Sequence, residues 1–139
     1  MTTVYLAGAI DRVSAEYATG WRQKAKRILR EVGLDVIDPT EGKELEREDV
    51  NTTLYTPAEI VETDLRAIER SDVLLVEMSR DDIPYIGTSM EIRQAYVWGK
   101  KIVVWGNPTS YWVRYHADYI CEGLDEAIEW IKQNVEVSE

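Results

Sequence analysis

The chain has 139 residues, the size of one ordinary domain, and it can bury a sizeable core without disulfides or structural metals. Its net charge of −10 argues against duplex nucleic acid or an anionic membrane as a partner, because both attract basic surfaces. A single cysteine, Cys121, excludes an internal disulfide and metal sites built from several thiolates. The sequence contains no signal-peptide pattern and no run of roughly 20 apolar residues, so a cytoplasmic protein is expected.

Short apolar runs alternate with helical patterns along the chain. Strands are expected at 3–10, 34–38, 72–78 and 101–105, with a short fifth strand near residue 120. Helices are expected at 14–32, from Thr56 onwards, at 88–98 and at about 123–134. The second helix has Thr56 as its N-cap and Pro57 at its first position, and its buried stripe is expected to contain Ile60, Val61, Leu65 and Ile68.

Two segments between these elements lack a clear period. Residues 40–55 are polar and aperiodic, and a loop of this length in a compact domain is usually functional or mobile. Residues 107–120 are aromatic, and the pattern predicts irregular structure there.

The alternation of strands and helices predicts one α/β domain over residues 1–139. We expect three layers, with helices on both faces of a mostly parallel, flavodoxin-like sheet. Such sheets bind ligands at the carboxyl ends of their strands, where the strand order reverses. The loops that should converge there contain Gly8–Arg12, Ser79–Ser89 and Asn107–Asp118.

Glu91, in the segment "GTSME", has two interpretations. Thr88 and Glu91 are three residues apart, which is the spacing of a capping box at the start of a helix. The same helix should begin just beyond a central strand, where the fold places its ligand. A carboxylate oriented there can attack a carbon with developing positive charge, as in glycoside cleavage through a covalent intermediate.

Asp64 and Gly87 add to the second interpretation. Asp64 lies beside the apolar stripe of the second helix, although a lone helical aspartate is usually a surface charge. Gly87 would let the backbone approach a sugar closely. Tyr5, in the first strand, has the position of an ordinary core residue.

The chain resembles the nucleoside 2-deoxyribosyltransferase family, which includes related nucleotide N-glycoside hydrolases. The resemblance is carried by the order and spacing of four segments: "VYLAGAI", "GWRQKAKRILREVGLDVIDP", "ETDLRAIERSDVLLVEM" and "GTSMEIRQAYVWGKKIVVW". It implies that Glu91 is the nucleophile and that Asp64 supports catalysis near the base and the sugar. It also implies that Tyr5 lies near the nucleophile, with Gly8 in the adjoining turn.

The resemblance leaves the group at the 5′ position of the sugar open. Six residues before the nucleophile, transferases of the family tend to carry Asp for a 5′-hydroxyl, and the hydrolases tend to carry Ser for a 5′-phosphate. This chain has Tyr85 there, with Asp81 and Asp82 nearby. The residues expected to contact the substrate are Gly8, Ile10, Arg12, Tyr85, Gly87, Thr88, Ser110 and Arg114.

The expected activity is cleavage of the N-glycosidic bond of a 2′-deoxynucleoside or its 5′-monophosphate, with transfer of the sugar to a free nucleobase. Transfer to water and a non-catalytic nucleotide-sensing module remain as alternatives. No cofactor and no metal are expected. The resemblance implies a homodimer or a dimer of dimers, in which Ser110, Arg114 or His116 reaches a neighbouring site. The lone His116 is otherwise interpreted as a packed loop residue.

Overall fold

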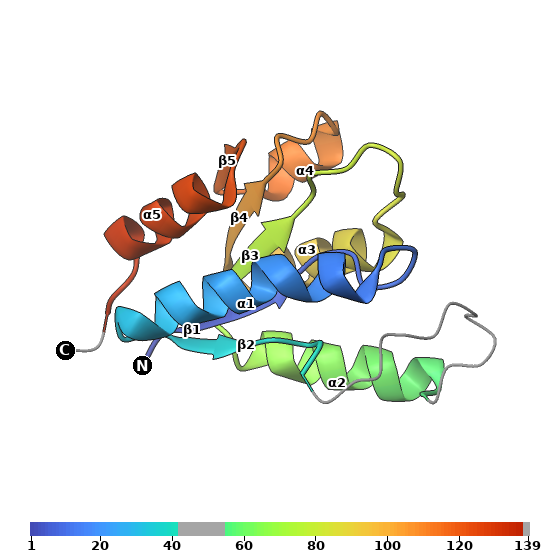
Figure 1. Cartoon of the computed structure of the whole chain (residues 1–139), viewed down its shortest axis with the longest axis horizontal. Helices are drawn as coiled ribbons and strands as arrows, with labels where there is room; N and C mark the ends of the chain where they lie inside the picture. Colours follow the sequence, from blue (N-terminus) through green and yellow to red (C-terminus); the bar gives the residue numbers. More distant parts are fainter. Residues whose placement is uncertain (42–54, 138–139) are drawn as a thin grey trace.

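Five parallel strands form the central sheet of the computed structural model, which describes residues 1–41 and 55–137 (Figure 1). They are β1 (Thr3–Ala7), β2 (Asp35–Ile37), β3 (Val73–Glu77), β4 (Lys101–Trp105) and β5 (Tyr119–Cys121). Their order is β2-β1-β3-β4-β5, and every neighbouring pair is parallel. This is the flavodoxin-like order, in which the strand order reverses between β1 and β3. The expected fold is therefore confirmed.

Helices connect these strands, and α2 begins where its capping signal predicts. They are α1 (Ala15–Glu31), α2 (Pro57–Glu69), α3 (Ile86–Val97), α4 (Tyr111–His116) and α5 (Leu124–Asn134). Ser14 caps α1 by accepting a hydrogen bond from the backbone of Tyr17 at 3.0 Å. Thr56 and Glu59 form a full capping box ahead of α2. Among the described residues, no helix is long and apolar enough to cross a membrane.

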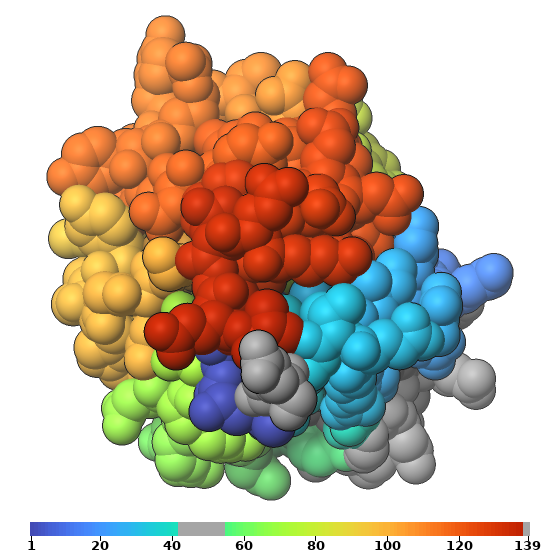
Figure 2. Space-filling model, turned by 90° about the vertical axis from the view of Figure 1, so that its left-hand side faces the viewer, coloured from blue at the N-terminus to red at the C-terminus, as the bar shows by residue number. Residues whose placement is uncertain are grey.

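The two faces of the sheet carry separate cores. On one face, Val4 and Leu6 of β1 pack among apolar residues of α1 and α5. On the other face, Tyr5 and Ala7 pack among apolar residues of α2, α3 and α4. Because side chains alternate along a strand, Tyr5 points into the layer formed by α2 and α3. The side of the molecule that Figure 2 shows is dominated by α5, which lies between α1 and α4.

Two expectations need correction. Val61 was expected in the buried stripe of α2, but its side chain is 52% exposed. The buried residues of this helix are Ala67 and Ile68, near its end. The start of α2 extends past the sheet toward the carboxyl ends of the strands (Figure 1). The segment expected to be irregular contains α4 (Tyr111–His116), a short helix with no side-chain cap. The long loop expected over 40–55 falls mainly outside the described residues.

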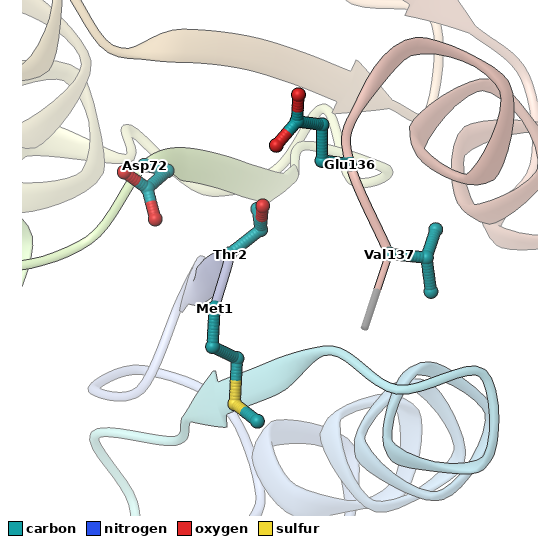
Figure 3. A pocket seen from close by; sticks show the side chains of 5 residues that line it. All are labelled: Met1, Thr2, Asp72, Glu136 and Val137. Carbon is teal, nitrogen blue, oxygen red and sulfur yellow. The ribbon is translucent and has the colours of Figure 1, made fainter. Parts of the chain in front are cut away.

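The first residues of the chain lie beside the segment that follows α5. A hollow between them is lined by Met1, Thr2, Asp72, Glu136 and Val137 (Figure 3). Thr2 and Asp72 directly precede β1 and β3, so this hollow lies at the amino ends of the strands. It is therefore at the opposite edge of the sheet from the expected ligand site.

Candidate active site

Tyr5 and Glu91 are joined by a hydrogen bond. The Tyr5 hydroxyl donates to Glu91 Oε2 at 2.8 Å, and this bond connects β1 to α3. Tyr5 is 1% exposed, whereas Glu91 is half-buried. Burial, followed by the negative charges of Glu91 and Asp64, raises the pKa of Tyr5 far above its ordinary value. The phenol therefore stays protonated and acts as a fixed donor that orients the Glu91 carboxylate.

Asp64 belongs to the same group of side chains. It is half-buried on α2, and its charge is close enough to Tyr5 to raise the pKa of that hydroxyl. The three candidate catalytic residues thus come together from β1, α2 and α3. Two carboxylates and a protonated phenol in one place match the chemistry of a glycoside-cleaving site, in which one carboxylate attacks and another group assists the leaving base.

The start of α3 shows that the capping-box interpretation of Glu91 is wrong. The helix begins at Ile86, two residues earlier than expected, and its N-cap is Tyr85 without a side-chain cap bond. Thr88 is buried within the first turn, and Glu91 lies in the second turn. Glu91 is therefore too far along α3 to cap it, and the influence of the helix dipole has largely fallen off there.

Gly8 directly follows β1, and its backbone lies close to the end of β3. A Cβ atom on Gly8 would be 3.0 Å from Cβ of Glu77 and 3.1 Å from the Trp21 ring. A side chain at this position would therefore push the turn away from β3. Of the other expected substrate contacts on this turn, Ile10 is half-buried and Arg12 is exposed with a left-handed backbone, at φ 65°.

Tyr85 is held by protein groups and does not face open space. Its side chain is buried, and its hydroxyl donates to Glu77 Oε2 at 2.5 Å while accepting from the Arg80 backbone N–H at 3.2 Å. Gly87, by contrast, is exposed, and a Cβ there would meet no heavy atom of residues 1–41 or 55–137 within 4 Å. The surface at the start of α3 can therefore be approached closely at Gly87.

Ser110 and Arg114 lie apart from the Tyr5–Glu91 pair. Both are exposed on α4 or at its N-cap, and the Arg114 guanidinium lies 5.8 Å from the Tyr111 ring centre. Helix α4 contacts α3 through Arg93, whose Nη1 is 3.2 Å from Nε2 of His116. Residues 91 and 93 point about 200° apart on a helix. His116 of α4 therefore lies on the side of α3 that faces away from Glu91, and the contact given for Arg114 is with Tyr111 of its own helix.

His116 is a packed residue, as its interpretation from the sequence favoured. Its side chain is buried, and Nδ1 donates to the Trp112 carbonyl at 2.6 Å. With the proton on Nδ1, Nε2 accepts the hydrogen bond from Arg93. His116 is thus engaged within its own chain. No group of three or more His, Cys, Asp or Glu side chains suited to a metal ion occurs among the described residues.

Arg22 is a buried residue that the sequence analysis did not single out. It is fully buried on α1 and donates to the backbone carbonyls of Leu6, Gly8, Ala9 and Ala18 at 2.7–3.4 Å. Burial lowers the pKa of Arg22, while Asp38, Tyr5 and Glu91 partly oppose this effect. The Arg22 guanidinium therefore holds the turn that follows β1 through hydrogen bonds to its carbonyl groups, and its positive charge interacts with Tyr5 and Glu91.

Glu77 is the second residue that was missed. It ends β3 and is fully buried, with hydrogen bonds from the Ala9 and Ser79 backbones and from the Tyr17 and Tyr85 hydroxyls. Burial alone would raise the pKa of Glu77, but the donors, led by Tyr85, hold it below its ordinary value. The sequence contained one signal for this residue, which is the acidic side chain at the end of the apolar run "VLLVE". An acidic residue in a buried strand is rarely without hydrogen-bond partners, so a bonded carboxylate could have been expected there.

Stability should depend on pH through Glu77 and Asp38. Burial tends to raise the pKa of Asp38, but hydrogen bonds from Thr40 and Lys26 lower it. A carboxylate whose pKa is lower in the folded than in the unfolded chain stabilises the fold above about pH 4, and this contribution is lost as the pH falls. We expect the free energy of unfolding, measured with urea, to decrease below about pH 4. The decrease should be shallower in Glu77→Gln, and an unchanged slope would contradict the assignment to this residue.

A sequence profile described as "Nucleoside 2-deoxyribosyltransferase like" matches residues 1–109. The chain belongs to this family. The matched region contains Tyr5, Asp64 and Glu91, and with them β1 to β4 of the sheet. Among curated proteins, none is similar enough in sequence to count as a relative.

The fold of this nucleoside 2-deoxyribosyltransferase-like chain is also similar to solved structures, and this similarity continues beyond residue 109. A 2-deoxyribosyltransferase from Bacillus psychrosaccharolyticus is 20% identical with a TM-score of 0.71, covering 97% of this chain and 93% of that one. One from Leishmania mexicana is 14% identical with a TM-score of 0.72, covering 98% and 100%. A CMP N-glycosidase from Clostridium botulinum is 21% identical with a TM-score of 0.65, covering 96% and 100%. At these identities, the likeness establishes the fold, including α4, β5 and α5.

Proposed function

We propose that this protein is a cytoplasmic enzyme that cleaves the N-glycosidic bond of 2′-deoxynucleosides or their 5′-monophosphates and transfers the deoxyribosyl group to another nucleobase. The observation that carries the proposal is the hydrogen bond from Tyr5 to Glu91 at 2.8 Å, with Asp64 beside it. The pair lies on β1 and α3, where the strand order reverses and ligands of this fold bind.

The reaction proceeds in two displacements. A Glu91 carboxylate oxygen attacks C1′ of the sugar, the bond from C1′ to the base nitrogen breaks, and its electron pair leaves with the base. Asp64 positions the sugar or passes a proton to the departing base. A nitrogen of the second base then attacks C1′ and displaces Glu91, which regenerates the free carboxylate. No metal or cofactor takes part in this scheme.

Transfer to water is the second candidate. The fold is also shared with the CMP N-glycosidase from Clostridium botulinum, and water at the second step would give a free sugar or sugar phosphate. Incubation with deoxynucleosides and deoxynucleotides, with and without a second free base, distinguishes the two reactions by their products. A sensing module would release no base under any of these conditions, so that result would exclude both enzymatic proposals.

A covalent intermediate is expected on Glu91. With a 2′-fluorinated deoxynucleoside analogue, the fluorine slows the second displacement and the glycosyl ester should accumulate. The mass of the intact protein should increase by that of the fluorosugar, and the modified peptide should contain Glu91. Glu91→Gln serves as the control and should remain unmodified. Labelling of another residue, or single-step inversion at C1′, would contradict the mechanism.

We also propose that two copies of the chain associate through α3 and α4. The two helices carry exposed apolar side chains, here named the aromatic patch, which are Tyr111 at 83%, Trp112 at 78%, Tyr115, Met90 and Val97. Exposed aromatic clusters of this kind are typical of protein interfaces. Ser110 and Arg114 are exposed at the start of α4 and within it, next to Tyr111 and Tyr115 in the sequence, and a second copy is the partner that would bring them near a substrate.

Mixed oligomers test whether the site is shared. Glu91→Gln subunits should be inactive alone, and Ser110→Ala/Arg114→Ala subunits should be weakly active alone. Mixing them should restore part of the activity, because some sites then receive an intact carboxylate from one chain and intact α4 residues from the other. A fully active monomer by light scattering at the assay concentration would exclude the shared site.

A further inference from the structure

The Tyr5–Glu91 pair joins two different elements, β1 and α3. Tyr5 is fixed in the sheet by β1, whereas Glu91 is placed by the start of α3. The distance between their side chains therefore depends on how the turn after β1 and the segment before α3 are fixed relative to each other. Both of these segments contact the same buried carboxylate, Glu77.

One oxygen of Glu77 holds the turn after β1. Oε1 accepts the backbone N–H of Ala9 at 3.2 Å, and Gly8 lies so close that a Cβ there would be 3.1 Å from the same oxygen. Ala9 is four residues beyond Tyr5 along the chain. The contact therefore fixes the carboxyl end of β1 against the end of β3.

The other oxygen of Glu77 holds the segment that leads into α3. Oε2 accepts the Ser79 backbone N–H at 2.9 Å, the Tyr17 hydroxyl at 2.8 Å and the Tyr85 hydroxyl at 2.5 Å. Tyr85 is the N-cap of α3 and has a left-handed backbone, with φ 51° and ψ 43°. A non-glycine residue in that conformation is strained and needs surrounding contacts to persist. The bond to Glu77 supplies one of them.

We propose that Glu77 is a positioning residue that sets the geometry of the Tyr5–Glu91 pair by fixing the turn after β1 and the start of α3 to one buried carboxylate. This inference rests on the proposed function for its catalytic consequence. Glu77 acts through other residues, since the structure shows it bonded to protein groups on both oxygens. Its ionised form suits this role, because a carboxylate can accept on both oxygens and five donor groups bond to it.

Glu77→Gln is the decisive variant. Each carboxylate oxygen accepts a backbone N–H, from Ala9 and from Ser79, and a backbone N–H cannot become an acceptor. An amide has only one oxygen, so one of the two segments must lose its bond. We expect kcat to fall about 100-fold, as small misplacements of reacting groups do, while KM changes by less than about threefold. Hydrogen exchange should become faster in residues 7–10 or 79–91 and stay unchanged in α5.

Two further variants make the result interpretable. Glu122→Gln makes the same chemical change at an exposed residue just after β5, at the same edge of the sheet, and should leave kcat and exchange unchanged. Tyr85→Phe keeps the carboxylate and removes the hydroxyl that bonds to Glu77 and to the Arg80 backbone, both within or leading into the segment before α3, so exchange should rise in 79–91 and not in 7–10. In the double variant, the fold-decrease in kcat should be smaller than the product of the two single fold-decreases, because both changes affect the bond between Tyr85 and Glu77.

Several outcomes would overturn the inference. They are wild-type kcat in folded Glu77→Gln, equal losses in Glu122→Gln, and fully multiplicative losses in the double variant. If Glu77→Gln does not fold, Tyr85→Phe decides by the same two measurements. If the wild-type chain cleaves no deoxynucleoside or deoxynucleotide, the proposed function fails separately. Hydrogen exchange is then the remaining test of whether Glu77 fixes the two segments, and unchanged exchange in both variants refutes this role.

Discussion

Replacing Glu91 with glutamine should abolish turnover and leave the fold intact. The amide removes the attacking carboxylate, and loss of a nucleophile lowers kcat by several orders of magnitude, roughly 10⁴-fold or more. The amide oxygen can still accept the hydrogen bond from Tyr5, so the free energy of unfolding should change by only about 1 kcal/mol. Base release from a deoxynucleoside, followed by chromatography, measures the first effect, and urea denaturation measures the second.

The matched control is Glu62→Gln, which makes the same change at an exposed position on α2. It should retain wild-type turnover and wild-type stability. Near-wild-type turnover in Glu91→Gln would refute the assignment of the nucleophile. Since α3 begins at Ile86, that result would also leave Glu91 without the capping role that the sequence had offered as the alternative.

Replacing Arg22 with methionine should cause the largest loss of stability. The side chain is completely buried, and its guanidinium donates to carbonyls of Leu6, Gly8, Ala9 and Ala18. Methionine fills much of the space but removes these four hydrogen bonds and the positive charge that lies 4.0 Å from Asp38 Oδ1. Breaking buried charge interactions in this way costs about 3–5 kcal/mol, a large part of the 5–15 kcal/mol that stabilises a typical domain.

Arg27→Met is the control for Arg22→Met. Arg27 is exposed on the same helix, so its replacement should change the free energy of unfolding by about 0.5 kcal/mol or less. Urea denaturation of the two variants gives the comparison directly. A loss of under about 1 kcal/mol in Arg22→Met would show that the turn after β1 is fixed by other contacts, and Glu77 would be the first to examine.

The sequence predicted most of the fold because the signals for strands and helix starts are local. Apolar runs located the strands, the spacing of apolar residues located α1, and Thr56 with Pro57 located the start of α2. The start of α3 was placed two residues late, since Tyr85 adopts a left-handed conformation that its residue type does not favour. Helix α4 was missed because it has six residues and no capping side chain.

The candidate site was predictable to a lesser extent. The family resemblance indicated Tyr5, Asp64 and Glu91, and the strand pattern placed the loops near them. Arg22 and Glu77 were missed because their partners are mainly backbone groups and hydroxyls distant in the sequence, such as Gly8 for Arg22 and Tyr17 for Glu77. Such contacts leave no spacing pattern along the chain. They become visible only when the turn after β1 is placed against the end of β3.

The candidate catalytic residues lie within regular elements, whereas several expected substrate contacts lie on turns or on a short helix. Tyr5, Asp64 and Glu91 belong to β1, α2 and α3, while Arg12 belongs to a turn and Arg114 to α4. Sites on strands and helices are held more precisely than sites on loops. An engineer seeking new sugar or base preferences would therefore randomise residues 10–13 and 80–83 and keep the three elements constant. Selectivity and bond cleavage could then be altered separately in this scaffold.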